Sequence, residues 1–236
     1  MHAVGIQSIH HHLACGGKML LDTNDQIAQR IRCEDAFEPQ VRAEFERIAG
    51  RKVNIIDIGA NVGYYSILGG KLIGPEKRLF SFEPQPRMID RLRRNVALSS
   101  LENVQVFPIA LSDSTGSVTF YVPPEGRESM GSMRANGRFD ISGTIQVNSQ
   151  RLDDVLQDLG NPKIGLIKMD AEGAELQILR GATDLLSSSD KPDLIFEGNE
   201  KNCRAFGYCV FDLLQFVGSF GYKLRQLDYE DWLAEA

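Results

Sequence analysis

The feature that most restricts the fold of this chain is a regular alternation of short apolar segments with amphipathic ones, which begins near residue 53. The apolar segments are expected to be strands, at 53–59, 78–84, 104–109, 164–170 and 193–200, with a last one at 222–228. Helical spacing marks the segments between them, at 62–74, 88–98, 152–159, 174–186 and 206–220. Because parallel strands need long, usually helical connections, this order predicts an α/β fold with a mostly parallel sheet and helices on both faces.

The segments outside this alternation define the expected domain organisation. Residues 117–122 and 144–149 are β-like, and the stretch between them is rich in Gly, Ser, Arg and Pro. Before residue 50, we expect an irregular start over 1–18, a short strand at 19–21 and a helix at 37–49. We therefore predict an N-terminal extension (1–50) with a strand and a helix, then one domain (51–236) with a loop insertion at 123–143.

Composition excludes several classes of protein. A length of 236 residues predicts one domain with extensions. A net charge of −6 argues against a nucleic-acid substrate, and no apolar run approaches the ~20 residues of a membrane span. The start of the chain lacks the pattern of a secretory signal, and the four cysteines form no C-x2-C pair, so we expect reduced thiols and a cytoplasmic protein. The run His10–His12 with Cys15 could chelate a metal, but a frayed terminus is the favoured interpretation and no metal is expected.

The most informative motif is D-I-G-A-N-V-G at residues 57–63. An apolar strand delivers Asp57 to its carboxyl end, where doubly wound sheets bind ligands, and Gly59 and Gly63 allow a close approach of the backbone. The spacing is neither G-x-G-x-x-G nor G-x4-G-K-[ST], so a phosphate-binding loop is not indicated. An acid two residues before the first glycine would repel a pyrophosphate but suits a cationic ligand, such as the ammonium of S-adenosylmethionine.

A second acid supports a nucleoside cofactor. Glu83 ends the next expected strand, 20 residues after Gly63, where an acid accepts hydrogen bonds from ribose hydroxyls. Either acid alone could be a solvated strand-end carboxylate. Together with the glycines and the helix between them, they predict a cofactor site.

Several motifs together resemble the FkbM-type S-adenosylmethionine-dependent methyltransferases. They cover roughly residues 50–200, and I-K-M-D-A-E-G-A-E is the most specific of them. The matching segments are 55–66, 80–86, 108–113, 151–156 and 167–175. The resemblance implies a Rossmann-like, seven-stranded methyltransferase sheet with a reversed final strand, and O-methylation of sugars or natural-product hydroxyls.

The resemblance also implies roles for individual residues in binding S-adenosylmethionine. Glu83 would hold the ribose, Ala110 and residues 111–113 would meet the adenine edge, and Asp170 would lie near the transferred methyl. The residues expected around the methionine part are Asp57, Gly59, Asn61 and Gly63, and Ala60 is also expected to bind the cofactor.

The end of the strand at 164–170 carries the expected catalytic groups. Asp170 and Glu172 precede a glycine turn, so both carboxylates should face the ligand edge and could act as a general base or bind a divalent cation. Glu172 could instead cap the following helix, where an acid is favourable. Lys168 lies on the same strand face as Asp170, so an ion pair with one of these acids is as plausible as a catalytic role. Glu197 could extend the acidic rim or be a solvated loop acid.

The predicted function is methyl transfer from S-adenosylmethionine to a hydroxyl of a small molecule such as a sugar or secondary metabolite. The alternatives are N-methylation of a small-molecule amine and a catalytically silent cofactor-binding subunit; a carboxyl acceptor would be repelled by the two acids. The loop at 123–143 could be a lid whose Arg127, Arg134 and Arg138 contact an anionic or sugar-like acceptor, or it could be a disordered surface loop.

Overall fold

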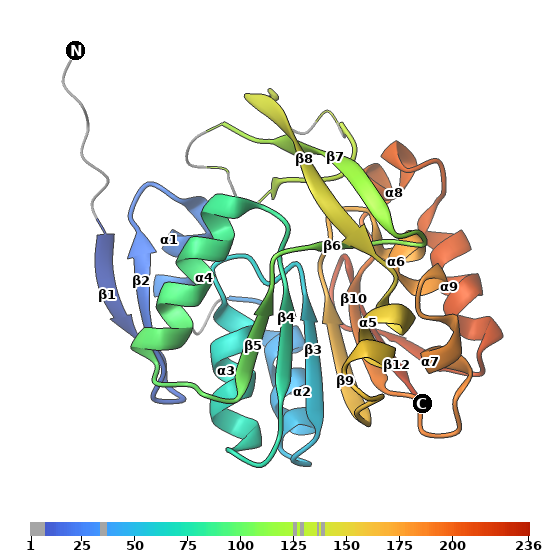
Figure 1. Cartoon of the computed structure of the whole chain (residues 1–236), viewed down its shortest axis with the longest axis horizontal. Coiled ribbons are helices and arrows are strands. Elements are labelled where there is room, and N and C mark those ends of the chain that lie inside the picture. Colours follow the sequence, from blue (N-terminus) through green and yellow to red (C-terminus); the bar gives the residue numbers. More distant parts are fainter. Residues whose placement is uncertain (1–7, 34–36, 125–126, 128–129, 136, 138–139) are drawn as a thin grey trace.

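The structure is a computed structural model that describes residues 8–33, 37–124, 127, 130–135, 137 and 140–236. Its centre is a seven-stranded sheet in the order β11-β12-β10-β9-β3-β4-β5 (Figure 1). The strands are β3 (Asn54–Ile58), β4 (Leu79–Phe82), β5 (Val104–Phe107), β9 (Ile164–Met169), β10 (Asp193–Glu197), β11 (Lys223–Gln226) and β12 (Asp231–Glu235). From β10 to β5 all neighbours are parallel, while β12 is antiparallel to both β10 and β11. The expected α/β fold with one reversed strand is confirmed.

Apolar residues on both sides of the strands bury the sheet between two helical layers. Ile55 and Ile56 are adjacent in β3 and point to opposite faces, and each is fully buried in a different hydrophobic cluster. One face is covered by α2 (Pro39–Ala49), α3 (Tyr64–Ile73) and α4 (Pro86–Leu98), and the other by α5 (Leu152–Asp158), α6 (Glu175–Arg180), α7 (Thr183–Ser187) and α9 (Val210–Ser219). Burial on both faces explains why these strands are uniformly apolar in sequence.

The N-terminal region is more regular than expected. Residues 8–12 form β1 (Ser8–His12), which pairs antiparallel with β2 (Lys18–Asp22), and a helix that was not expected follows as α1 (Gln26–Arg32). The strand β1 is polar and only partly buried, so backbone hydrogen bonds hold it against β2. Such bonds produce no apolar pattern in the sequence, which is why this strand was not expected. The Asn95 side chain of α4 accepts a hydrogen bond from the Leu20 amide at 2.8 Å, which fastens the hairpin to the main domain.

A second, three-stranded sheet lies beyond the carboxyl ends of the main sheet (Figure 1). It consists of β6 (Ala110–Leu111), β7 (Gly116–Val122) and β8 (Gly143–Gln150), in the order β6-β8-β7. The predicted strands at 117–122 and 144–149 are therefore confirmed, and they pair with each other rather than with the main sheet.

The main differences from the sequence prediction lie in the second half of the chain. The helix predicted over 174–186 is two helices that are separated at Gly181, where a Cβ would lie 2.1 Å from the Ser112 carbonyl oxygen. The helix predicted over 206–220 begins at Val210, and a separate α8 (Glu200–Ala205) precedes Gly207, which has a φ of 83°. The strand predicted at 222–228 is confirmed as β11, but it is not the last strand, because β12 returns between β10 and β11.

The described helices were also compared with the dimensions of a lipid bilayer. Within the described ranges, no helix has the length and apolar character needed to cross a membrane.

Candidate active site

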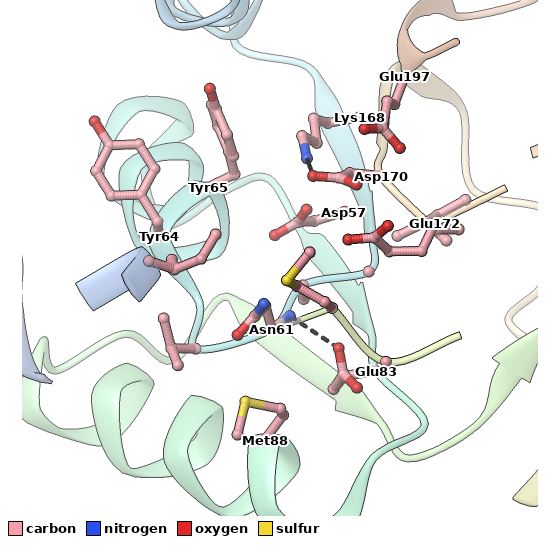
Figure 2. Close-up of a pocket in the computed structure, with 18 of the residues that line it drawn as sticks. Asp57, Asn61, Tyr64, Tyr65, Glu83, Met88, Lys168, Asp170, Glu172 and Glu197 are labelled. Atoms are coloured by element: carbon pink, nitrogen blue, oxygen red, sulfur yellow. Dashed lines mark hydrogen bonds and ion pairs between the residues drawn. The ribbon is translucent and has the colours of Figure 1, made fainter. Parts of the chain in front are cut away.

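A cavity of about 590 Å³ opens at the carboxyl ends of the central strands, where the strand order reverses between β3 and β9 (Figure 2). Ligands of open α/β sheets bind at this point. The residues that line it and that the sequence predicted are Asp57, Gly59, Ala60, Asn61, Glu83, Ala110, Asp170 and Glu172, with Lys168 and Glu197 among the residues weighed beside them. The size lies within the ordinary range of small-molecule pockets.

The turn after β3 approaches the turn after β9 so closely that only glycine fits. A Cβ on Gly59, whose φ is 74°, would lie 1.8 Å from the carbonyl oxygen of Asp170. The amides of Gly59 and Ala60 both donate to the Phe82 carbonyl at 3.0 Å, which fixes the turn to β4. Gly63 does not line the cavity; a Cβ there would lie 2.6 Å from Leu92 Cδ1, so this glycine allows α3 to pack against α4.

Glu83 is oriented by two backbone amides. Its Oε2 accepts from the Asn61 amide at 3.0 Å and its Oε1 from the Gln85 amide at 2.9 Å. The side chain is buried, and burial raises its pKa to about 7 although both amides favour the charged form. Each carboxylate oxygen has a second lone pair, so the group can still accept two hydroxyl donors from the cavity.

Asp57 is buried at the end of β3. Its Oδ2 accepts from the Ser66 hydroxyl at 2.6 Å, and Ser66 lies 2.8 Å from the Ser81 hydroxyl. Burial raises its pKa, while the Lys168 ammonium and Ser66 oppose that shift. The hydroxyl on α3 thus fixes the carboxylate in a single orientation beneath the cavity.

Lys168 and Asp170 form an ion pair, which is one of the two roles considered for this lysine. Lys168 Nζ lies 3.3 Å from Asp170 Oδ2 and 5.0 Å from the centre of the Tyr65 ring (Figure 2). Burial opposes the ammonium charge, but Asp170, Glu38 and Asp57 raise its pKa above the usual value. The lysine therefore stays charged and partly balances the acids around it.

The sequence analysis did not identify the acids on the far side of this lysine. Glu38 precedes α2 and accepts from the Tyr65 hydroxyl at 3.0 Å, and burial raises its pKa. Asp231, at the start of β12, has a pKa raised to about 8 by burial and by Asp170. Both line the cavity, yet they are 193 positions apart, counting from 38 to 231, and no local pattern relates them.

Glu172 lies beside Asp170 with its backbone in the left-handed region, at a φ of 52°. Its Oε2 accepts from Asn202 Nδ2 at 2.8 Å, and the same nitrogen is 3.4 Å from Glu197 Oε2. Helix α6 begins later, with Ala174 as its N-cap and no side-chain cap, so the capping role considered for Glu172 is not observed.

Some of the other residues predicted to contact the cofactor or acceptor line the cavity, and others do not. Ala110 and Leu111 line the cavity next to Met88, whereas Ser112 and Asp113 do not. In the loop insertion, Met130, Gly131 and Met133 line the cavity, while Arg127 and Arg134 are exposed and do not; Arg138 is outside the described residues. The described part of the loop thus contacts the cavity through apolar side chains, and a lid function stays a prediction.

Metal binding was considered for the acids and histidines. Across the part of the chain that the structure describes, no group of three or more His, Cys, Asp or Glu side chains is arranged to hold a metal ion.

Comparison with known proteins identifies the family. The methyltransferase FkbM domain matches residues 57–224, which is more than half of the chain. The chain is 34% identical to the 2-O-methyltransferase NoeI of Sinorhizobium fredii, over 57% of this chain and 59% of NoeI. It is 30% identical to the hexuronic acid methyltransferase AglP of Haloferax volcanii, over 56% of this chain and 51% of AglP. Each match therefore spans less than two thirds of the relative.

A solved structure supports the fold. The crystal structure of cofactor-bound Rv0187 from MTB has a TM-score of 0.52 at 14% identity, covering 80% of this chain and 76% of that chain. The fold is that of the class I methyltransferases, a class whose methyl donor is S-adenosylmethionine. The chain belongs to the FkbM methyltransferase family.

The cavity fits this cofactor on the structure's own evidence. Glu83 is held where two hydroxyl donors can reach it, and the turn at Gly59 brings backbone close to the cavity floor. Met88 and Ala110 add apolar surface suited to a base, and the carboxyl groups that line the cavity suit a cation. Glu38 and Asp231 line the cavity from positions outside residues 57–224, the span that the family model matches.

Proposed function

We propose that this protein transfers the methyl group of S-adenosylmethionine to a hydroxyl of a sugar or natural-product-like small molecule. The observation that carries the proposal is the Glu83 carboxylate, fixed by two backbone amides beside a glycine turn at the edge of the sheet. The names of the relatives support the acceptor class, since NoeI is a 2-O-methyltransferase and AglP acts on a hexuronic acid.

We assign each part of the cofactor to particular residues of the cavity. Glu83 would accept from the ribose hydroxyls, and Ala110 would contact the adenine. The residues proposed to surround the methionine part are Asp57, Gly59, Ala60 and Asn61, with Gly63 shaping the turn. The bound cofactor supplies an electrophilic methyl group on a sulfonium, so the protein's main task is to position the acceptor oxygen.

We propose Asp170 as the general base, with Glu172 as the second candidate. An alcohol is too weak an acid to ionise at neutral pH, so a positioned carboxylate that removes its proton assists attack. Asp170 lies at the end of β9, and Lys168 holds its Oδ2 at 3.3 Å. The proposed route uses no metal.

The proposal includes a small-molecule acceptor, no nucleic-acid partner and a cytoplasmic location. The net charge of −6 supports the first two, because nucleic-acid binding depends on basic surfaces. All four cysteines are free thiols, which supports a reducing compartment.

The test begins with calorimetry of S-adenosylhomocysteine binding to the purified chain, with NADH as the control ligand. Labelled S-adenosylmethionine is then offered with a neutral sugar, a uronic acid and a small-molecule amine. Transfer to oxygen supports the proposal. Transfer to the amine alone favours N-methylation, binding without any transfer favours a silent cofactor-binding subunit, and tight NADH binding overturns the cofactor assignment.

A further inference from the structure

Two acids on one side of the cavity share a buried amide. Glu172 and Glu197 both line the cavity, on the same side as Asp170 (Figure 2). The Nδ2 atom of Asn202, in α8, lies 2.8 Å from Glu172 Oε2 and 3.4 Å from Glu197 Oε2. Since an amide nitrogen carries two hydrogens, one side chain can serve both carboxyl groups.

The surrounding structure fixes this amide in place. Asn202 is fully buried, and its backbone amide donates to the side chain of Asn199, the N-cap of α8, at 3.0 Å. A Cβ on Gly173 would lie 2.6 Å from the Asn202 carbonyl oxygen, so α8 and the turn after β9 are in close contact. The Ser132 hydroxyl donates to the Glu172 carbonyl at 2.9 Å and holds the other side of that turn. Glu172 and Glu197 therefore keep a fixed spacing.

Several acids lie around Glu197. They are Asp170 directly after β9, Glu172 in the following turn, Glu175 in α6 and Glu230 in the β11–β12 connection. Burial and then these acids raise the pKa of Glu197 well above its usual value. Glu172 has the shorter of the two contacts with Asn202 Nδ2, at 2.8 Å.

We propose that Asn202 is a positioning residue that holds Glu172 and Glu197 as a binding site for two adjacent hydroxyls of an uncharged acceptor. The inference rests on the proposed function, because it assigns the acceptor to the same cavity. The two carboxyl groups, both bonded to one buried amide, present hydrogen-bonding oxygens side by side. Neighbouring hydroxyls, each of which donates and accepts, match that pair. A carboxylated sugar would instead place like charge against Glu172.

The selectivity of this site follows from the same geometry. An acceptor with a single hydroxyl can satisfy only one member of the pair, which leaves the other carboxyl group without its ligand contact. The reacting hydroxyl then lies next to the bound pair, within reach of Asp170, whereas the two bound hydroxyls keep their protons. Asn202 influences recognition through the two acids and takes no part in proton transfer.

The test uses a minimal probe on the intact protein saturated with S-adenosylhomocysteine. Carbon-13 NMR of labelled glutamate side chains, assigned with Glu172→Gln and Glu197→Gln, follows the addition of cis-1,2-cyclohexanediol or cyclohexanol. We expect the diol to shift both resonances saturably, at a concentration at least about tenfold lower than the monohydroxyl compound needs. Asn202→Leu should remove this difference. Asn103→Leu, which loses a buried amide bonded to Gly70 and Gly74 away from the cavity, should retain it.

Equal responses to the two probes, or no saturable response, would overturn the inference. So would unchanged diol preference in Asn202→Leu. If that variant does not fold, Glu172→Gln decides the matter, because it keeps the side-chain shape and should lose the preference while binding S-adenosylhomocysteine normally. Failure of the proposed function would be seen separately, as absent S-adenosylhomocysteine binding in the wild-type chain.

Discussion

Replacing Glu83 with alanine removes the group on which the cofactor assignment depends most directly. The carboxylate is buried and already accepts from the amides of Asn61 and Gln85 at 3.0 and 2.9 Å. These bonds fix its orientation in the free protein, so the ribose hydroxyls meet a group that needs no rearrangement. Glu83→Ala should therefore weaken cofactor binding directly.

The magnitude follows from the two hydroxyl contacts. A hydrogen bond to a charged group contributes roughly 1.5–3 kcal/mol, and water entering the vacated space replaces part of it. We expect the dissociation constant of S-adenosylhomocysteine to rise by roughly tenfold to a thousandfold. Glu83→Gln should give a smaller loss, because one carbonyl oxygen remains.

Isothermal calorimetry measures this change, with the exposed Glu76→Ala as the matched control. The pH dependence gives a second readout. Burial raises the pKa of Glu83 to about 7, and hydroxyl donors favour its charged form, so binding should release protons near neutral pH. The affinity should fall as the pH drops below about 7, and this dependence should disappear in Glu83→Gln. Unchanged affinity in Glu83→Ala would refute the ribose assignment.

Three further predictions concern packing, chemistry and stability. Gly59→Ala should abolish S-adenosylhomocysteine binding, because its Cβ would overlap the Asp170 carbonyl. Gly16 is the matched control, since it has a similar φ of 82° and open space around it. Gly16→Ala should only lower Tm, by roughly 2–8 °C in calorimetry. Asp170→Asn should lower kcat by roughly 10²–10⁴-fold, with a smaller loss of cofactor affinity. Wild-type turnover should survive EDTA, and activity that is lost on chelation and restored by Mg²⁺ would contradict the metal-free route. The folded pKa values of about 7 for Glu83 and about 8 for Asp231 exceed their unfolded values of 4.5 and 3.8, so the folded state binds more protons between these limits. Thermal melts should therefore show stability falling from pH 5 to pH 8, and an equally steep fall in Asp231→Asn would count against that assignment.

The part of the cavity at the strand ends could be predicted because its signals are local. Asp57, Glu83 and Asp170 each end an apolar strand, and the carboxyl ends of parallel strands meet at one edge of a sheet. The glycine at position 59 was expected from the same turn. The parallel direction of the strands was enough to place these residues at one edge.

The contacts on the other sides of the cavity could not be predicted in the same way. Asn202 belongs to a short helix that the sequence analysis missed, and its importance depends on packing against the turn after β9. Glu38 was within a helix prediction that gave no reason to place it near Lys168. The last strand, β12, is only five residues long, and its insertion beside β10 brings Asp231 to the cavity.

The sequence by itself determined the sheet, its helical layers and the carboxylates at the strand ends, because burial on both faces of a parallel sheet imposes a pattern on consecutive residues. Only the tertiary structure decided which side chains from α1, from the residue before α2 and from the β11–β12 connection line the cavity together, and which side chain of α8 contacts Glu172. Contacts between distant segments depend on how whole elements pack, and the side chains that make them obey no periodicity along the chain. Lys168 shows the difference: its strand position was predictable, but its place between Asp170 and the Tyr65 ring was set by the packing of α3.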